Sequence, residues 1–364
     1  MKVAIVHDWL IHMRGGEKVL EGIAELYPDA VIYTLFFDRS KLSPSLQKMT
    51  IKASWLQHLP GIKRYYRWLL PILPWVIQTL DVGNVNLVIS NSHCVAKGVK
   101  IPPGVKHICY CNTPMRYLWG YEEEYFSNFP FFITPLLTVI KGYLRKFDIE
   151  CNKSVDQFIS NSKNVQDRIK RFYSRAATVI YPPLDVDLYR PEEGLASSRK
   201  NDYYLVVSAF VPYKRIDLVI QAFNQLEKPL LIVGTGPLRP YYESLRKSQK
   251  ITFLGLIPGP ELKGFYAGAK AVIFPTEEDF GIVPLEAQAC GTPVIALGKG
   301  GALESVKFGH FFTVQSVEAI IQAVNEFEHL EFDRSKISHA VNGFSKQRFK
   351  EQIRKFIESK APSA

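Results

Sequence analysis

The stretch AVIFPTEEDFGIVPLEAQACGTPVIA, residues 271–296, has the pattern strand, loop, helix, strand. A buried strand ends at Pro275, Phe280 and Gly281 open a turn, and a largely apolar helix precedes the next strand. Val- and Ile-rich runs without polar alternation are typical of strands buried on both faces, as in parallel sheets covered by helices. The segment therefore predicts an α/β fold.

The same alternation continues along the chain in two series of apolar runs. The first comprises VAIVH, AVIYTLFF, NLVIS, HICYC, QFISN and TVIYP, and the second YYLVVS, LLIVG, ITFLG, AVIFP and PVIAL. Between them, RPEEGLASSRKND has the polar, Pro- and Gly-containing composition of a linker. We expect an N-terminal domain over 1–190, a linker over 191–202, a C-terminal domain over 203–343 and a terminal helix over 344–364.

Length and composition indicate a basic globular protein. The 364 residues include 45 Lys+Arg and 35 Asp+Glu, a formal charge of +10, and 47% are hydrophobic. This length suits two domains with separate cores and excludes a disordered chain. Met1 and Lys2 precede the first strand too closely for a signal peptide, and no apolar run reaches the ~18 residues of a membrane span. We therefore expect a cytoplasmic protein.

Five cysteines without a CxxC pair indicate reduced thiols rather than disulfides. His107, Cys109 and Cys111 alternate along one predicted strand, and thiolate with imidazole is a zinc ligand set. We favour buried thiols, because the spacing matches no standard zinc signature and cysteine is commonly buried.

Charged residues occur where strands of the second series end. Lys214 and Arg215 lie between a strand and a helix, where two cations and a helix N-terminus can neutralise a diphosphate; the alternative is two solvated surface cations. Glu278 lies in the loop after the strand at residue 275. Glu286 lies in the apolar helix, where a buried carboxylate needs hydrogen-bond donors such as ribose or sugar hydroxyls. A solvent-facing Glu is the alternative.

The first series contains two further candidates. Gly15 and Gly16 follow the first strand, before a helix predicted to begin near residue 17, and would let backbone N–H groups approach an anion. Plain turn geometry is the alternative. His93 lies just past a strand, in the opening turn of a helix capped by Asn91 or Ser92, where it could bind a substrate hydroxyl or be structural. GTGP at 234–237 lacks the rest of a dinucleotide fingerprint and is interpreted as a turn.

Over nearly its whole length the chain resembles the retaining, nucleotide-sugar-dependent glycosyltransferases of group 1, also called family 4. The resemblance rests on GGEKVLE, SNSKNVQDRIKRFY, TVIYPPLDVDLYRP, FVPYKRIDLVIQAF, LLIVGTGP and FPTEEDFGIVPLEAQACGTPVIA. Its most specific part is the pair Glu278 and Glu286, separated by seven residues. HICYCNTPMRYLWG and PPLDVDLYRP favour the subgroup similar to WbaZ-type mannosyltransferases of bacterial surface polysaccharide assembly.

The resemblance implies the GT-B fold, with two Rossmann-like domains facing across a cleft and a terminal helix that crosses back onto the first domain. It also implies three catalytic residues, which are His93, near the reacting carbon, Lys214 and Glu278. Donor binding would involve the ribose, the transferred sugar and the diphosphate, and its implied residues are Gly15, Gly16, Lys214, Arg215, Glu278, Phe280, Gly281, Ile282, Val283 and Glu286.

The implied activity is retaining transfer of a sugar, with mannose from GDP-mannose as the expected donor, to a lipid-linked or polysaccharide acceptor. Ser208 and Ala209 stand where many relatives have Gly-Arg, so Lys214 and Arg215 would carry more of the charge stabilisation. We expect no metal and no cofactor, because cations and helix dipoles can neutralise the leaving group. A nucleotide-sugar epimerase of similar fold and a basic nucleic-acid-binding module are the alternatives, and we expect no nucleic-acid partner.

The whole net charge arises between residues 39 and 121, which contain eleven Lys+Arg and one acid, Asp81. Within this stretch, IKRYYRWLLPILPWVIQTL at 62–80 places three cations beside Trp68, Trp75 and leucines, and these cations are Lys63, Arg64 and Arg67. Cations next to aromatics suit an anionic bilayer surface, so we expect peripheral association with the inner face of the cytoplasmic membrane. A core helix with a solvated basic face is the alternative.

Overall fold

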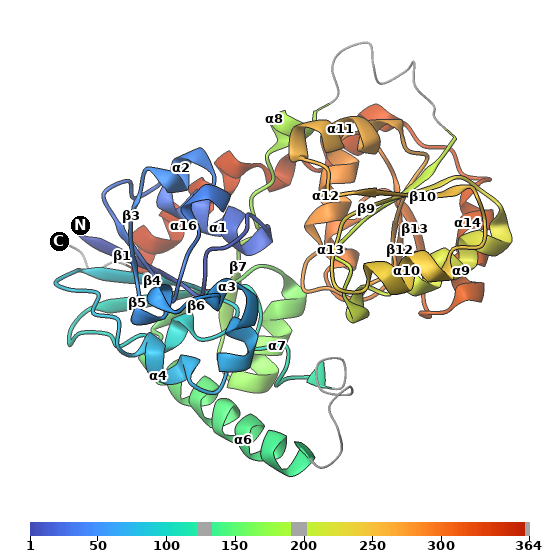
Figure 1. Ribbon diagram of the computed structural model, residues 1–364. Helices are drawn as coiled ribbons and strands as arrows, with labels where there is room; N and C mark the ends of the chain where they lie inside the picture. Colours follow the sequence, from blue (N-terminus) through green and yellow to red (C-terminus); the bar gives the residue numbers. More distant parts are fainter. Residues whose placement is uncertain (123–132, 191–201, 361–364) are drawn as a thin grey trace. The chain divides into compact units, whose positions relative to one another are not determined.

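The computed structural model describes residues 1–122, 133–190 and 202–360, which form two compact units (Figure 1). The first unit comprises residues 1–183 together with the chain from Gln347 onward, and the second comprises residues 184–346. The division thus falls between Pro183 and Leu184. The expected linker at 191–202 lies outside the described residues except for Asp202.

The first unit is built on a seven-stranded parallel sheet with the order β3-β2-β1-β4-β5-β6-β7. In register, His7 of β1 lies opposite Thr34 of β2 and Asn91 of β4. The strand order reverses between β1 and β4, which is where α/β sheets bind ligands at the carboxyl ends of their strands. The strands are β1 Val3–His7, β2 Val31–Thr34, β3 Thr50–Ala53, β4 Leu87–Ser92, β5 Lys106–Cys111, β6 Gln157–Ser160 and β7 Ala177–Val179.

Helices cover both faces of this sheet, and alternate residues of β1 pack into different cores. Ala4 and Val6 pack with α4 and α6, whereas Val3 and Ile5 pack with α1 and α16, which explains the continuous apolar run. The α-helices are α1 Gly15–Ala24, α2 Pro44–Gln47, α3 Ile62–Tyr65, α4 Leu73–Ile77, α6 Thr134–Glu150, α7 Lys163–Tyr173 and α16 Lys346–Lys360. The 3-10 helices are η1 Arg39–Lys41, η2 Trp55–His58, η3 Tyr66–Leu69, η4 Ala96–Gly98 and η6 Cys151–Ser154.

The second unit contains a six-stranded parallel sheet with the order β10-β9-β8-β11-β12-β13, reversing between β8 and β11. Its strands are β8 Tyr204–Val207, β9 Leu230–Val233, β10 Ile251–Gly255, β11 Val272–Phe274, β12 Val294–Leu297 and β13 Gly309–Phe312. Its helices are α8 Val186–Tyr189, η7 Pro212–Lys214, α9 Ile216–Leu226, α10 Arg239–Leu245, α11 Gly259–Gly268, α12 Ile282–Ala289, α13 Ala302–Ser305, α14 Val317–Phe327, α15 Arg334–Ala340 and η8 Asn342–Phe344.

The predicted α/β fold with two parallel sheets is confirmed, and two edge strands are additional to it. β3 and β13 were not predicted, because both lie at sheet edges and lack a continuous buried apolar run. The stretch 62–80 is not one helix: it divides into α3, η3 and α4, with Pro71 between η3 and α4 and Pro74 in the first turn of α4. None of the helices among the described residues combines the length and hydropathy that crossing a bilayer requires.

The last helix, α16, belongs to the first unit although the chain reaches it from the second. Phe349, Ile353, Phe356 and Ile357 are buried in the same core as α1 and β1. At Gly22 of α1 the Phe349 ring of α16 lies close to the backbone, since a Cβ there would lie 2.7 Å from the ring.

Candidate active site

The switch point of the second sheet brings together Lys214 and Glu278. Lys214 ends η7, which follows β8, and Glu278 lies in the loop that follows β11. Lys214 Nζ forms an ion pair with Glu278 Oε1, and both side chains are mostly buried, with 13% and 19% of their surfaces exposed. A cation and a carboxylate in this position can bind the anionic and hydroxyl groups of one polar ligand.

Glycines hold the Glu278 loop by allowing close backbone approach. Gly301 donates its N–H to the Glu278 carbonyl at 2.8 Å, and a Cβ on Gly301 would lie 2.2 Å from Phe280 Cα. Gly300 has a φ of 59°, and a Cβ at this position would lie 2.5 Å from the Glu278 carbonyl oxygen. Sequence reasoning missed this pair, although three glycines within GKGG after an apolar strand were a usable signal.

The Glu278 loop leads into the N-terminus of α12. Gly281 precedes the helix with a φ of 87°, and as a glycine it has no side chain to cap the first N–H groups. Phe280 and Gly281 are buried, whereas Ile282 and Val283 are half-buried. The uncapped N–H groups of this eight-residue helix are oriented to donate hydrogen bonds to an oxygen-rich ligand.

Arg215 is engaged within its own helix turn. Its Nε and Nη2 each lie 3.4 Å from the Asp217 carboxylate. The residue adopts a left-handed φ of 50°, which costs about 1–2 kcal/mol in a non-glycine residue. Arg215 is thus a paired cation next to Lys214 in the sequence, and its predicted contact with a diphosphate stays a prediction.

Glu286 is 6% exposed, so the solvent-facing alternative is wrong. The Tyr266 hydroxyl donates a hydrogen bond to its Oε2 at 3.0 Å. Burial and the Glu286 carboxylate raise the pKa values of both Tyr266 and Tyr189. Tyrosine hydroxyls therefore supply donors that the sequence prediction assigned to a sugar.

The switch point of the first sheet brings together Asp8 and His93. Asp8 follows β1, is fully buried, and accepts backbone N–H bonds from His93, Cys94, Val95 and Ala96 at 2.6–3.1 Å. The predicted cap at Asn91 or Ser92 is wrong: β4 continues through Ser92, and the Asp8 carboxylate binds the turn instead.

His93 Nδ1 lies 3.1 Å from Asp8 Oδ2, and the ring packs edge-on against Trp9 with centroids 4.7 Å apart. Its side chain keeps 30% of its surface exposed. Burial lowers the pKa of His93, against the opposing effect of Asp8. The result is an oriented imidazole, predominantly neutral at neutral pH, that can exchange hydrogen bonds with a hydroxyl group.

Gly15 and Gly16 form the first turn of α1, which begins two residues earlier than predicted. Neither has a left-handed φ, so turn geometry does not require glycine there. A Cβ on Gly15 would meet nothing within 4 Å, and one on Gly16 would only touch Asn112. Both positions keep the backbone open to a ligand.

A buried ion pair that the sequence did not predict lies under this turn. Glu17 accepts the Arg14 N–H at 2.9 Å, and its Oε1 lies 3.8 Å from His7 Nε2. Burial opposes charge on both groups, but their mutual contact outweighs it, raising the pKa of His7 and lowering that of Glu17. The pair rigidifies the helix start that carries Gly15 and Gly16.

The cysteine prediction is confirmed, since all five are free and buried. His107 binds Ser90 Oγ at 2.8 Å and the Ser154 carbonyl at 3.0 Å, so both its nitrogens have protein partners. No group of three or more His, Cys, Asp or Glu residues suited to a metal occurs within the described ranges. The chain's only Asp-x-Asp sequence is Asp185–Asp187, and Asp185 caps α8 by accepting the Leu188 N–H at 3.1 Å.

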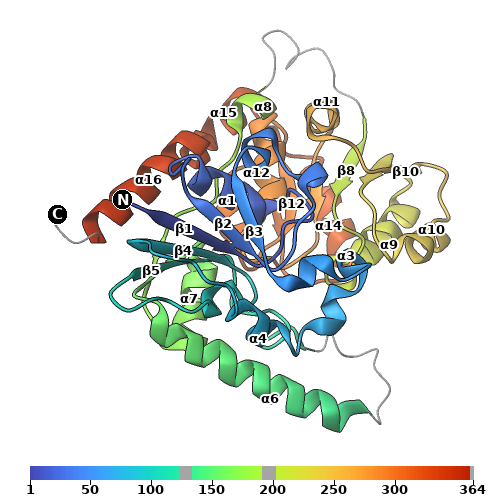
Figure 2. The same cartoon turned by 60° about the vertical axis from the view of Figure 1, so that its left-hand side comes forward.

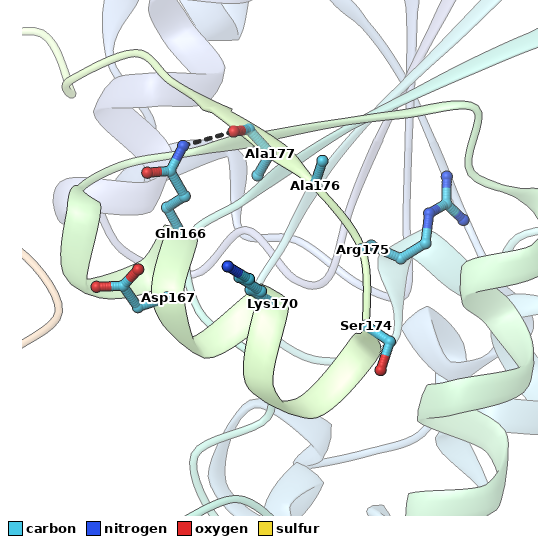
Figure 3. A pocket seen from close by; sticks show the side chains of 7 residues that line it. All are labelled: Gln166, Asp167, Lys170, Ser174, Arg175, Ala176 and Ala177. Atoms are coloured by element: carbon cyan, nitrogen blue, oxygen red, sulfur yellow. Dashed lines mark hydrogen bonds between the residues drawn. The ribbon is translucent and has the colours of Figure 1, made fainter.

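Figure 3 shows a pocket that contains none of these residues. It lies between the end of α7 and the start of β7, where Gln166 donates to the Ala177 carbonyl at 2.6 Å. Because β7 begins here, the pocket lies at the edge opposite the carboxyl ends of the strands. Its lining residues are Gln166, Asp167, Lys170, Ser174, Arg175, Ala176 and Ala177.

Residues 185–344 match the family model described as glycosyl transferases group 1. The match coincides with nearly all of the second unit, which is therefore similar in sequence to group 1 glycosyltransferases. It contains Lys214, Glu278 and the N-terminus of α12, which are the groups assembled at the switch point of its sheet.

Two curated relatives show the extent of the sequence similarity. The D-inositol 3-phosphate glycosyltransferase of Mycolicibacterium paratuberculosis is 32% identical over 148 residues, which are 36% of this chain and 34% of the relative. A GDP-mannose-dependent alpha-(1-6)-phosphatidylinositol monomannoside mannosyltransferase of Mycobacterium tuberculosis is 31% identical over 223 residues, 52% of this chain and 56% of the relative. The chain therefore matches between about a third and just over half of these relatives.

Solved structures match over the whole length and establish the GT-B fold. Anabaena HepE, crystallised with UDP and glucose, aligns with a TM-score of 0.70 at 18% identity, covering 99% of this chain and 100% of that one. Sucrose-phosphate synthase of Thermosynechococcus elongatus aligns with a TM-score of 0.73 at 17% identity, covering 99% of both chains.

Proposed function

We propose that the chain is a retaining glycosyltransferase that moves a hexose from a nucleotide-sugar donor to a lipid-linked or glycan acceptor in surface glycan synthesis. The observation that carries this proposal is the Lys214–Glu278 pair beside the uncapped N-terminus of α12, within the matched domain. GDP-mannose is the expected donor, supported by one mannosyltransferase among the relatives.

In the proposed reaction, the bond between the sugar carbon and the donor diphosphate breaks, and the acceptor oxygen forms the new bond on the same face. The acceptor proton passes to the departing phosphate. Lys214 would neutralise the leaving diphosphate, helped by N–H groups at Gly15 and Gly16, because a developing anion is stabilised by fixed donors in a dry site. No metal or cofactor is needed for these steps.

Sugar recognition is assigned to the remaining polar groups. Glu278 and the backbone N–H groups of residues 280–283 would hold hydroxyls of the transferred sugar, and His93 would contact it near the reacting carbon. Glu286 would accept hydrogen bonds from the donor ribose, alongside Tyr266. Arg215, which lies beside Asp217, would help Lys214 to neutralise the diphosphate.

We further propose peripheral association with the inner face of the cytoplasmic membrane through residues 39–121. Exposed Arg64, Arg67, Trp68 and Trp75 support this interpretation. Lys97, another cation of the stretch, adds no charge to the surface, because its side chain is 2% exposed and pairs with buried Asp148 at 2.8 Å.

The epimerase alternative receives no support from the comparisons, and binding of nucleic acid is expected to be absent.

A panel of nucleotide sugars, incubated with the protein in the presence of a chelator, tests the proposal through release of nucleoside diphosphate. We expect one donor to give release of nucleoside diphosphate. The chelator should not lower the rate of that release. Absence of transfer, hydrolysis and diphosphate binding with every donor would refute the enzyme, and interconversion of the free donor would favour the epimerase.

A further inference from the structure

Helix α6 has two apolar stripes on different faces. Ile140, Leu144 and Phe147 pack against the core that contains α4. Leu136, Val139 and Tyr143 are instead 60%, 70% and 47% exposed. Their spacing of three and four residues places them on one side of the helix. A helix of a globular protein normally needs only the core-facing stripe, so the second one requires an explanation.

The neighbouring segment exposes large apolar side chains as well. Trp68, Ile72 and Trp75 are 73%, 39% and 59% exposed. The Trp75 ring also lies beside that of Trp55, with centroids 6.0 Å apart. Helices α4 and α6 lie side by side in both views (Figures 1 and 2) and share one core. The first unit therefore combines two adjacent elements with unburied apolar groups.

The charge of this unit favours an anionic surface as the partner. Residues 1–183 and 347–364 contain 28 Lys+Arg and 16 Asp+Glu, a net +12, whereas residues 184–346 contain 17 and 19, a net −2. Arg64, Arg67 and Lys146 are exposed on the elements that carry the apolar groups. A second copy meeting this face would bring like charges together, whereas anionic lipid headgroups would be attracted.

We propose that the α6 stripe, defined as Leu136, Val139 and Tyr143, inserts into the interfacial region of an anionic lipid bilayer. This inference rests on the proposed membrane association and adds a second anchor outside residues 39–121. Seventeen helical residues span about 25 Å, less than a bilayer core of ~30 Å, so α6 would lie in the plane of the interface.

The experiment measures binding of the full chain to vesicles of phosphatidylcholine with and without phosphatidylglycerol. In the double variant Leu136→Ser and Val139→Ser, we expect binding to the anionic vesicles to fall by about 10-fold or more, because two exposed aliphatic side chains that would be buried in the bilayer are lost. The matched control is Leu256→Ser in the second unit, where an equally apolar side chain is 79% exposed. It should bind as the wild type does.

A labelled variant tests insertion without relying on the stability of the double variant. All five native cysteines are buried, so Val139→Cys offers one reactive thiol for an environment-sensitive fluorophore. We expect its emission to shift to the blue with anionic vesicles, and no shift for the same label at Leu256→Cys. Equal responses of the two labels would overturn the proposal.

The outcomes separate this proposal from the proposed function. If the wild type binds anionic vesicles and the double variant binds them equally, the α6 stripe is not an anchor, although membrane association through 39–121 stands. If the wild type does not bind, both membrane proposals fail, while donor hydrolysis measured without vesicles still reports on the enzyme. A change in oligomeric state in the double variant, measured by light scattering, would also overturn the proposal in favour of self-association.

Discussion

Lys214 and Glu278 neutralise each other in the described structure, and an anionic donor would compete for the same ammonium group. A diphosphate brings more negative charge than one carboxylate and can share the cation with it. In the proposed reaction, the ion pair would hold the Lys214 side chain in place before the donor binds. Arg215, one residue later, is likewise paired, since its guanidinium lies 3.4 Å from the Asp217 carboxylate.

We predict that Lys214→Ala lowers kcat about 100- to 1,000-fold, the cost of removing one fixed group that stabilises a developing anion. KM should change much less, because the interaction strengthens as the diphosphate departs. Arg215→Ala is the matched control and should lose less activity. Steady-state release of nucleoside diphosphate measures both, and wild-type turnover in Lys214→Ala would contradict the assignment.

The buried side chain of His107 makes the free energy of unfolding depend on pH. Burial lowers its pKa from 6.5 to about 4. Between these values the unfolded chain binds a proton that the folded chain does not, so the free energy of unfolding falls as the pH falls, by up to about 1.4 kcal/mol per pH unit. Above pH 6.5 His107 contributes no such dependence.

We predict that His107→Gln flattens the decline in stability between about pH 6.5 and pH 4, since the amide can keep hydrogen-bond partners but cannot titrate. Urea unfolding at several pH values measures the slope for wild type and variant. The test compares how steeply the free energy of unfolding changes with pH, so it remains valid even if the variant is less stable at every pH. Parallel curves would show that His107 does not carry this dependence.

Helices α1 and α16 pack closely at Gly22. Gly22 allows the Phe349 ring to lie against the α1 backbone, and the ring is itself fixed in the core of the first unit. Gly142, in the middle of α6, has an open environment with nothing within 4 Å of a Cβ. The same substitution at these two helical positions should therefore have opposite effects.

We predict that Gly22→Ala lowers the free energy of unfolding of the first unit by about 1–3 kcal/mol, because the ring must shift. Gly142→Ala should raise it by up to about 1 kcal/mol through helix propensity. Urea denaturation of both variants provides the comparison. Stabilisation by Gly22→Ala would mean that α16 does not pack as described.

At the scale of the whole molecule, each unit closes its own core, but the first is discontinuous in sequence. The chain completes the second unit and then returns α16 to the first. Phe349, Ile353, Phe356 and Ile357 join the core of α1 and β1, and none belongs to the core built around β8 and β9. The core of α1 and β1 is therefore complete only when α16 is in place.

We predict that a chain ending at Lys346 loses the first unit and keeps the second. Four buried apolar side chains contribute about 1.5–3 kcal/mol each, which together approach the whole stability of a domain. Hydrogen exchange followed by mass spectrometry should show lost protection in β1 and β4 and retained protection in β8 and β11. Retained protection in β1 would contradict this dependence on α16.

Sequence patterns alone determined the class of the fold, because strands buried on both faces must be continuously apolar and such runs are visible without a structure. β1 and β4 were predicted in this way, whereas the edge strands β3 and β13 lack the pattern. The pair Glu278 and Glu286 was also visible, since its spacing is local.

Only the tertiary structure decided which distant groups meet. Asp8 lies 85 residues before His93, and its contact with the turn at 93–96 depends on β1 and β4 being adjacent in the sheet. The tyrosine contact with Glu286 and the glycines behind Glu278 likewise join separate elements. Burial and charge pattern are properties of short segments, but hydrogen bonds between segments depend on strand order and register, which a sequence specifies only through the complete fold.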